Sequence, residues 1–169
     1  MTPGLLTAVT FLPTLGALAL LLVPRRLGGL HRAIGLAVAV ITFLISIPLW
    51  TRFDGDSADF QFEEVARWLP SLGVSYHIGI DGISLLLVML TTFLTPLALA
   101  SAWHAIEDRT KEFVITVLLL ETGMLGVFVS LDLFLFFVFW EAMLIRMYLI
   151  IGVWGGGNRV YAAVKFVLY

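Results

Sequence analysis

The sequence predicts an all-α membrane protein, a polytopic bundle of transmembrane helices, on the strength of three observations. Apolar residues make up 60% of the 169-residue chain and charged residues 13%, whereas soluble domains average about 45–50% and about 25%. A chain this short has too little interior to bury so much apolar surface away from water. Five apolar runs are long enough to cross a hydrocarbon core of roughly 30 Å, and a sixth helix begins near the end.

Composition also excludes several function classes. The net charge is −2, and no basic cluster indicates a nucleic-acid partner. The chain has no cysteine, which excludes disulfides, thiolate metal sites and cysteine-ligated iron–sulfur clusters within it. The three histidines are expected in loops far apart in sequence, so no metal site is predicted; they are His31, His77 and His104. We therefore expect no metal and no cofactor in this chain, and a lipid bilayer around it.

Residues 1–51 are predicted to hold the first two spans, Leu5–Val23 and Ala33–Thr51. Pro13 lies inside the first run, where a membrane helix tolerates it because neighbouring helices satisfy the freed carbonyl. No basic region precedes that run, and it is long enough to span. The N-terminus therefore does not have the pattern of a cleavable signal peptide.

Residues 52–81 interrupt this pattern and are predicted to form an extramembrane loop. Charged residues lie there among glycine and proline, and no apolar run reaches spanning length. Trp68 and Tyr76 have the amphipathic rings that are favoured at a membrane surface. Part of the loop is expected either to lie on that surface or to fold back over neighbouring helices.

Residues 82–169 are predicted to hold three more spans and the start of a sixth helix at Arg159. Asp81 is well placed to be the N-cap of the first of these spans, because its carboxylate can accept a hydrogen bond from an unpaired backbone amide. The three spans are Gly82–Trp103, Phe113–Leu131 and Phe134–Val153.

The distribution of lysine and arginine predicts the orientation of the chain. The first, third and fifth connections carry six of these cations, whereas the other side of the membrane carries only Arg52 and Arg67. Cytoplasmic loops are enriched in lysine and arginine, so the odd-numbered connections are expected in the cytoplasm and the N-terminus outside it. The six cations are Arg25, Arg26, Arg32, Arg109, Lys111 and Arg159.

Glu141 is the main candidate functional residue because it lies near the middle of the fifth span. A charged group at this depth costs at least about 2.5–3.5 kcal/mol, so such residues usually face a bundle interior or a water path. Burial disfavours the ionised carboxyl and a nearby cation favours it. A carboxyl between these influences can load and release a proton. The alternative is a protonated glutamate that donates an interhelical hydrogen bond.

Three further groups are candidates for a polar path. Lys165 in the sixth helix can titrate if it is desolvated, or its long side chain can extend to the interface. Glu121 in the fourth span faces either a polar channel or a cation on a neighbouring helix. Asp132, at the tight turn before the fifth span, is better suited to capping that helix.

Arg146 lies five residues after Glu141, about 140° around the helix and about 7.5 Å along it. The two residues therefore do not share a face, and a close ion pair between them is not expected. A guanidinium at this depth needs another acid, a water pocket or the interface.

Three segments of the sequence resemble one family. These are GIDGISLLLVMLTTFLTPLALASAW, LFLFFVFWEAMLI and RVYAAVKFVLY. They are similar to the antiporter-like subunit M (chain 4) of proton-translocating NADH:quinone oxidoreductase, respiratory complex I. The DGIS start of the third helix and the FWE motif of the fifth are the most specific parts of this resemblance.

The resemblance implies a fold of about 14 transmembrane helices with two inverted five-helix repeats, of which this chain is expected to be the N-terminal part. It implies that Glu141 and Lys165 take part in proton translocation, with Asp132 and Glu121 beside them. NADH, flavin, iron–sulfur clusters and quinone are expected in partner subunits. The implied partners are other complex I membrane subunits, especially neighbouring antiporter-like ones, and the implied location is a bacterial inner membrane.

Two departures from the family pattern leave alternatives open. The family usually has proline where this chain has Arg146, and the chain ends before the later helices of the family fold. A proton path made by this chain alone would therefore be incomplete. The alternatives are a related component of a multi-subunit monovalent cation/proton antiporter and a non-transporting truncated scaffold.

Overall fold

The computed structural model describes residues 4–26, 28–69 and 73–168, and the chain is mostly helical, as predicted. Five helices in this part of the chain are long and apolar enough to cross a membrane. A sixth, shorter helix follows, and one two-stranded antiparallel sheet connects the second and third helices. The elements are α1 (Leu5–Leu22), α2 (Gly28–Thr51), β1 (Gln61–Leu69), β2 (Val74–Ile80), α3 (Gly82–Ser101), α4 (Thr110–Val129), α5 (Leu133–Trp154) and α6 (Arg159–Leu168).

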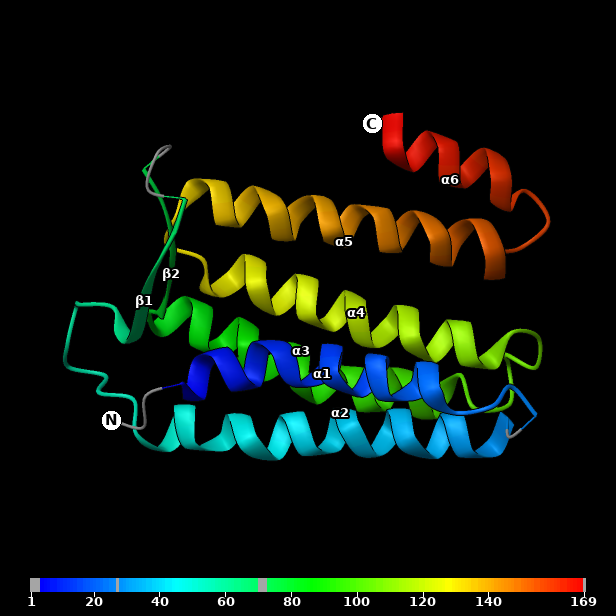
Figure 1. The fold of residues 1–169 in the computed structure, drawn as a ribbon, viewed down its shortest axis with the longest axis horizontal. Helices are drawn as coiled ribbons and strands as arrows, with labels where there is room; N and C mark the ends of the chain where they lie inside the picture. The colour runs from blue at the N-terminus through cyan, green and yellow to red at the C-terminus, as the bar shows by residue number, and fades with distance from the viewer. Residues whose placement is uncertain (1–3, 27, 70–72, 169) are drawn as a thin grey trace.

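The first four helices pack against one another, and α5 and α6 are added to one side of them (Figure 1). Helix α4 contacts α1, α2 and α3 on one side and α5 on the other. Helix α6 packs against α5 alone among the helices that the structure describes, apart from any weaker contact. The β1–β2 hairpin lies at the end of the bundle where α3 and α5 begin (Figure 1).

The packed core has two parts. One surrounds the hairpin end and joins α1, α3, α4 and α5 to buried hairpin side chains, among them Phe62, Ile78 and Ile80. The other lies toward the opposite end and contains buried side chains of α1, α2, α3 and α4, among them Leu20, Val114 and Leu118. Outward-facing positions of the helices are leucine, isoleucine and phenylalanine, which suits contact with lipid rather than water.

The segment predicted as a loop, 52–81, contains the hairpin, so that expectation was wrong for residues 61–69 and 74–80. Strand β2 alternates apolar and polar residues in the pattern of a half-buried strand, with Tyr76, Ile78 and Ile80 separated by His77 and Gly79. A search for apolar runs long enough to span a membrane does not detect this alternation of apolar and polar residues, which repeats every two residues. Of the two alternatives for this segment, the structure supports folding back over the helices, because Phe62, Ile78 and Ile80 are buried in a core with helix side chains.

The predicted spans agree with the helices to within a few residues, except at the start of α2. This helix begins at Gly28 rather than Ala33, so His31 lies in a helix and is fully buried, contrary to the expectation of a loop. The charge on neighbouring Arg32 does not end the helix, because its guanidinium donates to Ile106 O at 2.7 Å. His77 is likewise in β2, where its ring pairs with Glu63 at 2.9 Å.

The predicted helix cap at Asp81 is confirmed. The Asp81 carboxylate accepts from Ser84 N at 2.7 Å, and the Ser84 hydroxyl accepts from Asp81 N at 2.8 Å, which together form a capping box at the start of α3. The Ser84 hydroxyl also donates to the Asp81 carboxylate at 2.6 Å, and this bond, followed by that from Ser84 N, holds the pKa of Asp81 below its usual value. At the other end of the bundle, Lys111 Nζ donates to Leu21 O and Val23 O, and its charge offsets the negative end of the α1 dipole.

Candidate functional site

Glu141 lies between two grooves on the exposed side of α5. The first, the α4–α5 groove, has a volume of about 630 Å³ and is lined by apolar side chains together with Thr116, Glu141 and Arg146. The second, the α5–α6 groove, has a volume of about 790 Å³ and is lined by Glu141, Tyr148 and residues of α6. Glu141 is exposed within this chain and contributes to both grooves. Its carboxyl can therefore be approached from either side of α5.

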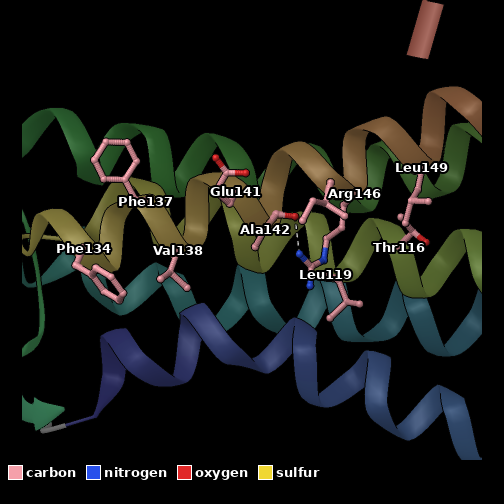
Figure 2. A pocket seen from close by; sticks show the side chains of 10 residues that line it. Thr116, Leu119, Phe134, Phe137, Val138, Glu141, Ala142, Arg146 and Leu149 are labelled. Atoms are coloured by element: carbon pink, nitrogen blue, oxygen red, sulfur yellow. Dashed lines mark hydrogen bonds between the residues drawn. The ribbon is translucent and has the colours of Figure 1, made fainter. Parts of the chain in front are cut away.

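Arg146 does not pair with Glu141, as the helical spacing predicted. Figure 2 shows the two side chains pointing in different directions, with the guanidinium turned back along α5. Arg146 donates from Nη1 to Ala142 O, one turn earlier in the same helix. Its Nε is buried without a hydrogen-bond partner among the described residues. The cation thus contributes positive charge to the α4–α5 groove in which Glu141 lies.

Lys165 lies on α6, and its Nζ is 5.4 Å from the centroid of the Tyr161 ring. This distance allows a cation–π contact, which partly compensates an ammonium group outside bulk water. Lys165 does not line either groove, whereas its neighbours Val164 and Phe166 line the α5–α6 groove that also holds Glu141. Lys165 therefore lies on the helix next to the one that carries Glu141, but its side chain does not line the groove between these two helices.

Glu121 is in a different environment, inside the four-helix part of the bundle. Its side chain is fully buried in α4, and neither carboxyl oxygen has a hydrogen-bond partner among the described residues. The Thr95 side chain of α3 approaches it, but the Thr95 hydroxyl donates to Thr91 O at 2.9 Å. The expectation of a cationic partner on a neighbouring helix finds no support in the part of the chain that the structure describes.

Asp132 has the capping role that its sequence position predicted, together with a second role. One carboxylate oxygen accepts from Phe134 N at 2.9 Å and Leu135 N at 3.2 Å at the start of α5. The other accepts from Ser75 N at 3.0 Å in β2. These bonds, with that from the Ser75 amide as the largest cause, hold the pKa of Asp132 below its usual value. Asp132 therefore joins the hairpin to α5.

Sequence reasoning missed Glu64, which caps α1 from the hairpin. Residue Gly4 precedes α1 with a φ of 87° and makes no side-chain cap. Glu64 of β1 instead accepts from Leu6 N at 3.0 Å and from the Thr7 hydroxyl, and the Tyr76 hydroxyl lies 2.7 Å from that of Thr7. The acid lies 58 residues from the Leu6 amide that it caps, so only the hairpin pattern could have indicated the contact.

Comparison with known proteins identifies relatives of this chain and a solved structure with the same arrangement of helices. Residues 60–127 match the family model described as "NADH-ubiquinone oxidoreductase chain 4, amino terminus". Residues 130–169 match the model described as "NADH:quinone oxidoreductase/Mrp antiporter, TM". NADH-quinone oxidoreductase subunit M of Rhodobacter capsulatus is 50% identical over 98% of this chain and 33% of its own length. The chain belongs to the chain 4, or subunit M, family of NADH:quinone oxidoreductases.

Further relatives extend the same relationship. NADH-ubiquinone oxidoreductase chain 4 of Marchantia polymorpha is 45% identical over 97% of this chain and 33% of its own length. A chain of respiratory complex I from Thermus thermophilus is 31% identical with a TM-score of 0.80, over 97% of this chain and 32% of that one. The chain thus spans about a third of the length of the relatives that it matches. It is a multi-pass membrane protein with the helical arrangement of that family.

Proposed function

We propose that this chain is part of a membrane-arm subunit of an NADH:quinone oxidoreductase and takes part in proton translocation. NADH oxidation and quinone reduction occur in partner subunits, which drive the proton movement. Family membership supports this proposal, since relatives at up to 50% identity carry the names of subunit M and chain 4 of such enzymes. In this proposal the chain itself holds no flavin, iron–sulfur cluster or quinone, and its lack of cysteine excludes a cysteine-ligated cluster within it.

The observation that carries the proposal is the position of Glu141 between the two grooves. A carboxyl in the middle of a 22-residue membrane helix is costly unless it has a use or a partner. The α4–α5 groove adds the positive charge of Arg146 on one side, and the α5–α6 groove leads toward the helix of Lys165 on the other. Glu141 takes up a proton from one side and releases it on the other as the charges around it change.

The proposal extends to location and partners. The chain lies in a bacterial inner membrane with its N-terminus and hairpin outside the cytoplasm, because six of its eight interfacial lysines and arginines flank the opposite end. Its partners are other membrane subunits of the same enzyme, in particular neighbouring antiporter-like subunits. The exposed apolar face of α5 is suited to contact with such helices or with lipid.

A second candidate is a component of a multi-subunit cation/proton antiporter. The family model over residues 130–169 names both NADH:quinone oxidoreductases and Mrp antiporters. A chain of the Mrp complex from Dietzia sp. has a TM-score of 0.74 at 18% identity, which shows a shared fold alone. Sodium-dependent proton exchange without NADH oxidation would favour this candidate.

The test is Glu141→Gln in the full-length subunit, assembled in membrane vesicles. Proton uptake and NADH oxidation are measured on the same vesicles, with Glu107→Gln in the exposed connection before α4 as the matched control. We expect Glu141→Gln to reduce proton uptake to the level seen without NADH, and Glu107→Gln to leave it unchanged. Normal uptake by a normally assembled Glu141→Gln enzyme would remove Glu141 from the mechanism and favour a scaffold role.

A further inference from the structure

Glu121 is a buried acid that the proposed role of Glu141 does not use. It lies at the middle of α4, fully covered, with two carboxyl oxygens that lack hydrogen-bond partners among the described residues. Buried polar atoms without partners are rare in folded proteins, and each one calls for a proton, a water molecule or a ligand. An ionised carboxylate at this position would be far more costly than a protonated one, because no described residue neutralises it.

The charged and titratable groups on the elements packed around α4 leave Glu121 without a nearby counter-ion. Helices α1 and α3 carry no ionisable side chain. Those of α2 are at its basic end, and those of α5 include Glu141 and Arg146, which line the α4–α5 groove rather than the bundle interior. The groups are His31 and Arg32 on α2, Lys111 and Glu112 on α4, Glu141, Arg146 and Tyr148 on α5, and Tyr76 and His77 on β2.

A row of hydroxyl groups on α1 extends from the hairpin end of the bundle to Thr122, the residue that follows Glu121 on α4. Thr7, Thr10 and Thr14 are spaced by three and four residues on α1 and therefore share one face of the helix. At one end, the Thr14 hydroxyl donates at 2.8 Å to that of Thr122, the residue next to Glu121. We call these three threonines the α1 hydroxyl row.

At the other end of the α1 hydroxyl row lies the Glu64 carboxylate. The Thr7 hydroxyl donates to Glu64 and lies 2.7 Å from the Tyr76 hydroxyl. Thr10 is buried between the two ends, where its hydroxyl donates to Leu6 O at 2.9 Å and keeps its oxygen as an acceptor. Consecutive hydroxyls are about 4.5 and about 6 Å apart along the helix axis, a gap that one water molecule can bridge.

We propose that Glu121 is a second proton-binding site of the chain and that it exchanges its proton with the hairpin side of the membrane along the α1 hydroxyl row. In each transfer the Glu121 acid gives its proton to a water molecule beside Thr14 and becomes a carboxylate. Each hydroxyl or water along the row accepts one proton and releases another, and the Glu64 carboxylate accepts the last and becomes an acid. The site is separate from the grooves of Glu141, and its proton exchange does not depend on the proposed role of the chain in pumping.

The experiment measures this exchange directly, in the resting enzyme without NADH. The infrared spectrum of the reconstituted full-length assembly is recorded as water is replaced by D2O, and the spectrum of Glu121→Gln is subtracted. We expect a carbonyl band of a protonated, buried carboxylic acid that shifts in D2O and is absent from Glu121→Gln. Should that variant fail to assemble, Glu121→Asp moves the band and serves for the same assignment.

The route is tested with a matched pair of threonine variants. Thr14→Val removes the hydroxyl next to Glu121 and is expected to slow the exchange of the band about tenfold, the effect of losing one hydrogen-bonded step. Thr116→Val is the control, because the Thr116 hydroxyl donates to Glu112 O and faces the α4–α5 groove. Absence of the band would show that Glu121 is ionised and would overturn the site. Equal exchange rates in Thr14→Val and Thr116→Val would overturn the route.

Discussion

The two membrane carboxyls lie in regions that differ in how they are packed. Helix α4, which carries Glu121, has 44% of its span buried within the chain, whereas α5, which carries Glu141, has 11%. The first four helices and the hairpin cover each other's polar groups with their own side chains. Helices α5 and α6 instead present Glu141 in grooves lined by exposed phenylalanine, isoleucine and leucine.

This difference shows that depth in the membrane does not by itself define the role of an acid. Both carboxyls are near the middle of an apolar helix, but only Glu141 opens on grooves from which a proton can approach on two sides. Glu121 is fully covered by side chains of its own bundle. The junction between the regions is the α4–α5 contact, and the hairpin fixes its end.

Gly126→Ala is expected to have the largest effect, because it breaks this junction. A Cβ at Gly126 would collide with the ring of Phe139 on α5, which cannot move without disturbing the core around it. Overpacking of this kind costs about 1–3 kcal/mol. Gly152→Ala at the α5–α6 contact is the control, because its Cβ would lie 3.6 Å from that of Ala163, an ordinary contact. Thermal unfolding in detergent should show a lower midpoint for Gly126→Ala alone, and equal midpoints would contradict the close packing of α4 on α5.

Glu64→Ala is expected to have the next largest effect, because it removes the cap of α1. The first amides of α1 lose their acceptor, which costs about 0.5–2 kcal/mol in comparable caps. The adjacent Glu63→Ala is the matched control, since it removes only a half-exposed pair with His77 worth about 0.2–1 kcal/mol. Chemical unfolding of the two variants tests this order. A Glu63→Ala protein less stable than Glu64→Ala would show that the hairpin does not hold α1 through Glu64.

Asp132 gives the smallest expected effect, one that depends on pH. Its pKa is below the ordinary value of about 3.9, so its hydrogen bonds stabilise the fold above that value. The stabilisation is lost as the pH falls through the lowered pKa of the folded state. Unfolding midpoints measured at falling pH should decline more steeply for the wild type than for Asp132→Asn, while Asp59→Asn in the exposed connection should follow the wild type. Parallel profiles for all three would mean that Asp132 does not link β2 to α5.

Much of the fold could be predicted because a lipid solvent imposes simple rules on the chain. Length and apolarity predicted all five spans, and capping chemistry predicted Asp81 and Asp132, since an N-cap acts on amides two or three residues away. The position of Arg146 away from Glu141 followed from helix geometry. These predictions all depend on local sequence.

The parts that could not be predicted depend on contacts between distant residues. Glu64 caps a helix that begins 59 residues earlier, and the burial of His31 follows from an early start of α2 that no charge rule indicates. The difference between Glu121 and Glu141 could not be read from either helix, because it depends on which neighbours cover each face. The sequence predicted that both acids lie in membrane spans, whereas the difference in their environments follows from how the helices pack.

Thiol labelling at the two acidic positions tests the contrast between the two carboxyls most directly. These 169 residues contain no cysteine, so Glu141→Cys and Glu121→Cys each add one thiol to them, and membranes with the unsubstituted subunit give the background from cysteines elsewhere. Membranes that contain the full-length subunit are treated with a small, charged, water-soluble thiol reagent. We predict that Glu141→Cys reacts readily and that Glu121→Cys reacts only after denaturation. Equal reaction at both positions in the native membrane would contradict the conclusion that position 141 is accessible while position 121 is covered.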